Sequence, residues 1–105
     1  MDDIVKKVVQ FRDDRDWKRF HTPENLAKSI SIEAAELLEN FQWDTNYCKE
    51  RVYDELADVL IYCILMADAL KINIEEAISL KLEKNLKKYP VEKAKGNSKK
   101  YTEFE

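Results

Sequence analysis

Glycine and proline are scarce in this sequence of 105 residues, which contains a single glycine and only two prolines. These two residues mark tight turns and the ends of strands, so their scarcity argues against a fold built from many short strands. The helix-favouring residues Leu, Ala, Glu and Lys are abundant instead. We therefore expect an all-α fold in one domain. A domain of this length buries only about two-thirds of its unfolded surface, so self-association would help it.

Cysteines and long apolar runs are also few. Cys48 and Cys63 are the only cysteines, and Cys63 lies inside the apolar run 59–67. We interpret both as reduced thiols of a cytoplasmic protein. The run is about half of the ~20 residues needed to cross a bilayer, and no basic and then apolar leader opens the chain. These features predict a soluble protein with no membrane partner.

The formal net charge is only −3. Acidic residues gather in the middle of the chain, whereas lysine dominates from Lys81 to Lys100. No broad basic stripe follows one face, which argues against a nucleic-acid polymer as partner.

Apolar residues at helical spacing predict four helices. Thr22-Pro23-Glu24 is a typical helix start, Asn73 opens a capping box, and Pro90 ends the last helix. A helical domain over 1–90 and a flexible or ligand-ordered basic tail over 91–105 follow. The expected helices run from Asp2 or Asp3 to Asp14, from Pro23 to Phe41, from Tyr47 or Lys49 to Leu70, and from Asn73 to Tyr89, with an aromatic loop over 16–21.

In the first two predicted helices, the sequence separates the residues that face solvent from those that face the core. The first should place Lys6, Lys7 and Arg12 in solvent, opposite an apolar side formed by Ile4, Val5, Val8, Val9 and Phe11. The second should bury a stripe made of Leu26, Ile30, Ala34, Leu37, Leu38 and Phe41, with Glu33 at its border and Glu36 a little further out.

Two pairs of acids are the strongest candidate site. Glu33 and Glu36 lie three residues apart on one predicted helix, and Glu55 and Asp58 repeat this spacing on its antiparallel neighbour. Four hard oxygen ligands leaning into apolar stripes favour Mg²⁺, with Mn²⁺ as the alternative, and one or two ions are possible.

Two other interpretations of the acids are open. They could be salt-bridge partners on solvated helix faces, which is the usual role of such pairs in a charged chain. They could also hold two iron or manganese ions, but such bundles need a Glu-x-x-His pair from each of two helices. His21 is the only histidine and lies outside any such pair.

Cations and aromatic residues complete the candidate site. Lys81, Asn85 and Lys88 share one face of the last helix, where they could bind phosphates or, alternatively, extend past the core into solvent; Tyr62, one turn after Asp58, could add a hydroxyl. Trp17, Phe20, His21 and Trp43 could form a pocket for a base or plug the bundle ends, and Phe20 is the one that we expect in the core.

Several motifs together resemble one known family. The stretch 11–27, the segments 33–39 and 41–43, Glu55-Leu56-Ala57-Asp58-Val59-Leu60, Lys81-x-x-x-Asn85-x-x-Lys88-Tyr89-Pro90 and Lys95-Gly96-Asn97-Ser98 are similar to those of the MazG-like pyrophosphohydrolases. Within that family, the sequence most resembles the dCTP pyrophosphatases.

The resemblance implies a fold, a reaction and a role for several candidate residues. It implies a four-helix MazG-like bundle that assembles as a homodimer or homotetramer through its central helices. It also implies a Mg²⁺-dependent enzyme that hydrolyses a nucleoside triphosphate, dCTP or a modified dCTP, to the monophosphate and pyrophosphate. The role of this reaction is open between cleansing of the nucleotide pool and supply of a dUMP precursor. The implied residues are Glu33, Glu36, Glu55 and Asp58 for the metal, Tyr62, Lys81 and Asn85 for phosphate, and His21 and Trp43 for the base.

The catalytic base is left open between Glu33 and Glu36, with Glu36 preferred. A contrasting hypothesis makes the chain a non-catalytic helical module whose apolar third helix serves only for oligomerisation. Release of pyrophosphate that depends on Mg²⁺ would distinguish the two.

Overall fold

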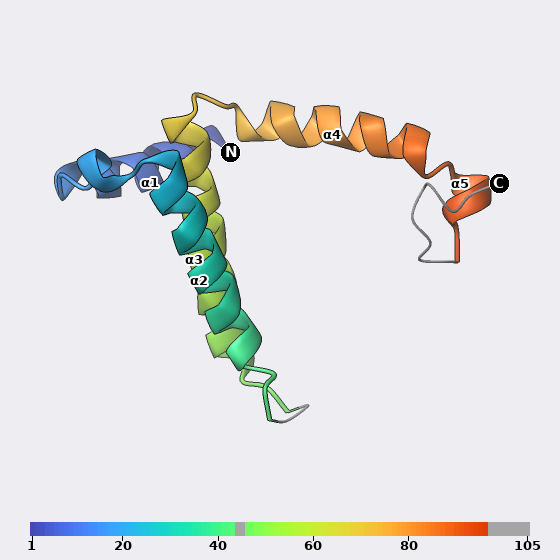
Figure 1. Ribbon diagram of the computed structural model, residues 1–105, viewed down its shortest axis with the longest axis horizontal. Coiled ribbons are helices and arrows are strands. Elements are labelled where there is room, and N and C mark those ends of the chain that lie inside the picture. The colour runs from blue at the N-terminus through green and yellow to red at the C-terminus, as the bar shows by residue number, and fades with distance from the viewer. Residues whose placement is uncertain (44–45, 97–105) are drawn as a thin grey trace. The chain divides into compact units, whose positions relative to one another are not determined.

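The structure is a computed structural model that describes residues 1–43 and 46–96. Every regular element in these ranges is helical (Figure 1), which confirms the predicted all-α class. The chain divides into two compact units, Met1–Ile72 and Asn73–Glu105. The first contains α1 (Asp2–Asp14), the 3₁₀ turn η1 (Lys18–Phe20), α2 (Pro23–Glu39) and α3 (Lys49–Ala69); the second contains α4 (Ile74–Lys88) and α5 (Val91–Ala94).

An antiparallel pair of helices, α2 and α3, forms the body of the first unit (Figure 1). Buried and half-buried positions recur at spacings of three and four residues along both helices, which is the pattern of a narrow coiled-coil seam. The seam residues are Leu26, Ile30, Glu33, Leu37 and Asn40 of the α2 side and Val52, Glu55, Val59, Tyr62 and Met66 of α3. Two acids therefore occupy positions that normally take apolar side chains.

The predicted apolar stripe of α2 was too wide. Ala34, Leu38 and Phe41 are exposed, and the exposed fraction of Leu38 is 68%. Within this unit the main packing partner of α2 is α3, so a narrow seam is covered and the outer part of the stripe is not.

The prediction that Arg12 faces solvent was wrong. Its side chain is 3% exposed, and one guanidinium nitrogen lies 2.6 Å from an Asp68 carboxylate oxygen of α3. A second nitrogen lies 2.8 Å from Asp13. Burial of an arginine is tolerated because both carboxylates satisfy its charge and donors. Val8 and Arg12 therefore form the docking face of α1, while Phe11, which was assigned to the apolar side of this helix, is 50% exposed.

Side-chain caps set the starts of two helices as predicted. The Thr22 hydroxyl accepts a hydrogen bond from the Asn25 amide at 3.2 Å, and the Asn73 side chain accepts one from the Glu76 amide at 2.9 Å. At its other end α2 stops at Glu39, two residues before the expected Phe41. There the Asn40 side chain donates to the Leu37 carbonyl at 3.1 Å and satisfies a group that the next helical turn would have used.

Two helices end without the glycine that usually follows a helix. Asp16 after α1 and Lys71 after α3 have positive φ angles of 55° and 56°. After α3, the Ile72 amide donates to the Ala67 carbonyl at 2.8 Å and the Lys71 amide donates to the backbone carbonyl of Asp68 at 3.1 Å, which is the Schellman pattern. The same pattern follows α1. A chain with one glycine thus places Asp and Lys in a conformation that favours glycine.

The second unit consists of α4 and the short helix α5. α5 lies in the region predicted as a tail, and residues 97–105 of that region lie outside the described part of the chain. None of the helices in the described ranges is long and apolar enough to span a membrane.

Candidate active site

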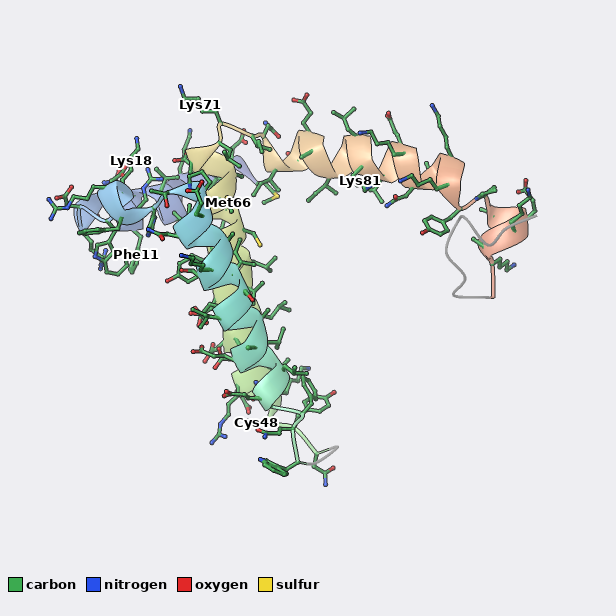
Figure 2. The ribbon with its side chains drawn as sticks, in the orientation of Figure 1. Phe11, Lys18, Cys48, Met66, Lys71 and Lys81 are labelled. Atoms are coloured by element: carbon green, nitrogen blue, oxygen red, sulfur yellow. The ribbon has the colours of Figure 1, made fainter. Side chains whose placement is uncertain are left out.

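Three carboxylates meet at the seam between α2 and α3, two from seam positions and one, Asp58, from an exposed position beside them. Glu33 of α2 and Glu55 and Asp58 of α3 each offer one oxygen, and these three oxygens lie within 4.8 Å of one another. Figure 2 shows carboxylate oxygens gathered along one side of the helix pair, between the levels of the labelled residues Met66 and Cys48. The meeting follows from the antiparallel pairing, because seam positions on the two helices face each other.

Two oxygens of this group lack a partner. Glu33 Oε2 and Glu55 Oε2 are buried and accept no hydrogen bond from any residue in the described ranges. Burying an unpaired carboxylate is costly, and a bound cation would remove that cost. The orphaned oxygens and the all-oxygen donor set therefore fit a divalent cation of the Mg²⁺ type.

Burial and neighbouring acids raise the pKa values of Glu33 and Glu55. Burial, followed by the interaction with Glu36 and the negative charges of Asp58 and Glu55, raises the pKa of Glu33 to about 7. Burial raises the pKa of Glu55 as well, with Glu36 and Asp58 as further causes. Glu36 therefore interacts with both seam acids, although it is exposed and lies outside the group of three.

An open, mainly polar pocket of about 500 Å³ adjoins the carboxylates. It is large enough for a nucleotide, since ligand pockets commonly measure about 300–1,000 Å³. Its walls come from the end of α2, the connection to α3 and the first turns of α3. The lining residues are Glu36, Glu39, Asn40, Asn46, Tyr47, Cys48, Arg51 and Glu55.

The residues predicted to bind phosphate lie in both units. Tyr62 is half-buried on α3, one turn after Asp58, in the same seam as the carboxylates. Lys81, Asn85 and Lys88 lie on α4, where their spacing of four and three places them on one face. Because α4 belongs to the second unit, their part in the site stays a prediction.

The predicted base-binding residues occupy opposite ends of α2. Trp17 and His21 precede this helix, whereas Trp43 follows it and is 89% exposed. The 17 residues of α2 rise by about 25 Å at 1.5 Å per residue, so one chain does not bring these three side chains together. Trp17 packs edge-on against Phe11 with ring centroids 5.7 Å apart. Phe20, expected in the core, is 55% exposed in the single chain.

Sequence reasoning missed several pocket-lining residues, notably Asn40, Tyr47 and Arg51. Asn40 lies four residues after Glu36, and Arg51 lies four residues before Glu55. A search one helical turn beyond each acid would have found both.

Comparisons with known proteins agree with this site. The MazG-like family matches residues 28–104. The chain is 35% identical to human dCTP pyrophosphatase 1 over 114 aligned positions, which cover 99% of this chain and 67% of the human protein. The mouse dCTP pyrophosphatase 1 is 34% identical with the same coverage.

A solved structure is also similar. It is the crystal structure of a pyrophosphatase from Archaeoglobus fulgidus DSM 4304, with 46% sequence identity and a TM-score of 0.79. The match covers 86% of this chain and 92% of that chain. From these relatives and the family match, the chain belongs to the MazG-like family and is an enzyme of its nucleoside triphosphate pyrophosphohydrolase class.

Proposed function

We propose that the enzyme uses Mg²⁺ to hydrolyse dCTP, or a modified dCTP, to the monophosphate and pyrophosphate, and so cleanses the nucleotide pool. The observation that carries this proposal is the group Glu33, Glu55 and Asp58, with two orphaned oxygens in the seam of a MazG-like chain. Because the chain belongs to an enzyme class, the alternative of a non-catalytic module falls away. The catalytic domain remains assigned to residues 1–90.

Glu33, Glu36, Glu55 and Asp58 would hold the metal, which when bound neutralises phosphate charge and polarises the bond to be cleaved. Glu36 is our choice as general base. It lines the open pocket, where water and substrate can enter, whereas Glu33 lies in the seam. Glu36 would take a proton from water as the water oxygen attacks the α-phosphorus, and pyrophosphate would leave. Tyr62, Lys81, Asn85 and Lys88 would bind the phosphates.

The choice of dCTP rests on the relatives, since two of them are named dCTP pyrophosphatase 1. Stacking on an aromatic ring supplies about 1–3 kcal/mol without selecting a base, so selection needs a polar edge. We assign this role to His21, assisted by Trp17 and Trp43, with the two ends of α2 supplied by different chains of the oligomer proposed below. The buried Nδ1 of His21, which lacks a partner in the described residues, is a free group of the required kind.

We further propose that the enzyme is a homodimer or homotetramer of the cytoplasm, where its substrate would be found. Large apolar side chains stay exposed on the single chain, and such patches usually mark an interface. On α3 they include Leu56, Leu60 and Ile61, with exposed fractions of 47%, 53% and 37%.

A panel of nucleoside triphosphates, assayed for pyrophosphate with Mg²⁺, with Mn²⁺ and with EDTA, tests the proposal. We expect the highest kcat/KM for dCTP and no release in EDTA. Faster hydrolysis of ATP or dGTP would overturn the base assignment alone. His21→Ala should narrow the dCTP to dATP ratio of kcat/KM; an equal loss for both would mean that His21 does not contact the base.

A further inference from the structure

One positively charged residue lines the pocket and has no role in the reaction described so far. Arg51 lies in the first turn of α3, four residues before Glu55, and borders the same cavity as Glu36 and Glu55. The other charged residues of that wall are Glu36, Glu39 and Glu55. Arg51 is thus a single cation among three acids.

Arg51 has no partner within ranges 1–43 and 46–96. Its guanidinium makes no ion pair and no hydrogen bond there, despite the nearby carboxylates. The other arginines of the first unit behave differently: Arg12 and Arg19 pair with acids, and Arg15 donates to the Phe11 carbonyl at 2.9 Å. The five donors of Arg51 are therefore available to a ligand that enters the pocket.

A polyphosphate is the ligand that this combination fits. A metal held by the seam acids would neutralise one side of the phosphate chain, and a guanidinium one helical turn away would neutralise the other. Arginine also presents two parallel donors that match two phosphate oxygens, a geometry that lysine lacks.

We infer that Arg51 is a substrate-binding residue that contacts the phosphate chain of the nucleotide in the pocket beside Glu36 and Glu55. This inference rests on the proposed function, since it takes a nucleoside triphosphate as the ligand. It adds a phosphate contact from the first turn of α3 to those expected from Tyr62 and from α4.

The test measures binding without catalysis. The Kd of α,β-methylene dCTP is measured by calorimetry with Mg²⁺ for the unmodified protein and for Arg51→Gln, Arg51→Lys and Lys49→Gln. Glutamine favours helices, so Arg51→Gln should fold, and circular dichroism checks this. Lys49 is the matched control, because it is an exposed cation in the same helical turn that does not line the pocket.

We expect Arg51→Gln to weaken binding roughly ten- to a hundredfold, Arg51→Lys to weaken it less, and Lys49→Gln to stay within about twofold. Without nucleotide, Arg51→Gln should bind Mg²⁺ at least as tightly as the unmodified protein, because a positive charge beside the acids is gone. A purely structural role would instead weaken Mg²⁺ binding too, and this result would overturn the inference.

Equal nucleotide affinity of the unmodified protein and Arg51→Gln would also overturn it. If the unmodified protein binds the analogue but releases no pyrophosphate from dCTP, the proposed function fails while the role of Arg51 stands. If the unmodified protein does not bind the analogue, both fail.

Discussion

Glu55 combines two conflicting properties at the residue scale, since it is an acid in an apolar seam and it has a buried oxygen without a partner. We expect Glu55→Gln to lower the turnover number by at least about a hundredfold, because the amide keeps the volume but removes a charge that the cation needs. The helical fold should persist. Pyrophosphate release and circular dichroism measure the two effects.

Asp54→Asn is the matched control for Glu55→Gln. Asp54 is the preceding residue of α3, is exposed and lies outside the group of three carboxylates. Its replacement should leave turnover within about twofold, as expected for a surface change. Near-normal turnover of Glu55→Gln would remove this residue from the site.

His21 offers a second measurement at this scale, because it is the only histidine of the chain. Burial lowers the pKa of His21 below the ordinary histidine value of 6.5, and the positive charge of Arg12 lowers it further. The contribution of His21 to the free energy of unfolding is therefore complete above its pKa in the unfolded chain. It is lost as pH falls through the pKa of His21 in the folded protein. We expect its single NMR titration to have a midpoint below 6.5; a midpoint at or above this value would contradict the burial of the ring.

At the element scale, the ends of α1 and α3 place non-glycine residues at positive φ. Lys71→Gly should raise the free energy of unfolding by about 0.5–1 kcal/mol, because the left-handed conformation costs lysine more than glycine. Asp16→Gly should raise the free energy of unfolding by less, since Asp tolerates the left-handed conformation better than lysine does. Urea unfolding measures both differences.

Lys84→Gly in the middle of α4 is the control, and it should lower the free energy of unfolding by about 1 kcal/mol. The sign of the effect should therefore reverse between the two lysines. A loss of stability in Lys71→Gly would mean that the Lys71 side chain contributes more than the strain that it imposes.

The helices themselves were largely predictable, because caps and apolar spacing are local features. Thr22 and Asn73 were identified as helix starts from their own neighbours in sequence. The partner of each helix face is not local. The sequence around Arg12 indicates a surface residue, because the ion pair that buries it comes from Asp68 of α3. The sequence around Leu38 indicates a core residue, but α3, the main partner of α2, does not cover it.

The candidate site shows the same division. Spacing alone placed Glu33 and Glu55 on facing helices, and the structure brings them together with Asp58. Trp17 and Trp43 were grouped because both are aromatic and near helix ends, although the predicted helix over 23–41 lies between them and its length already separates them. The sequence does not mark Arg51 as a site residue, since exposed arginines are common on helices. Its position in the lining of the pocket is what identifies it.

At the scale of the whole molecule, the metal should control stability in a pH-dependent way. Because the pKa of Glu33 is raised to about 7, the stability that this group contributes is complete below its pKa in the unfolded chain and is lost as pH rises through about 7. The metal-free protein should therefore become less stable between pH 5 and 8. Mg²⁺ should raise Tm more at pH 8 than at pH 5, because protons compete with the cation.

Scanning calorimetry with EDTA or Mg²⁺ at both pH values measures this effect. Glu33→Gln should flatten the pH dependence and remove most of the response to Mg²⁺. Equal Mg²⁺ shifts in Tm at the two pH values would show that the seam acids do not bind the ion.

Assembly is the second property at this scale. Light scattering should find at least two chains per particle at micromolar concentration, since the exposed apolar residues of α3 need a cover. Leu60→Glu should shift the particle toward the monomer, because an interface would have to bury the new charge. Gln10→Glu, which adds the same charge to exposed α1, should not. A fully active monomeric enzyme would contradict the proposed assembly.

The acids in the seam between α2 and α3 also set a limit on how the protein can be improved. Leucine at position 33 or 55 would complete the apolar repeat and relieve charge repulsion, so it should strengthen the helix pair. A library selected only for heat resistance would therefore enrich such variants and lose the catalyst. Heat resistance and turnover compete for the same two positions, as expected where an active site is placed inside a packing surface.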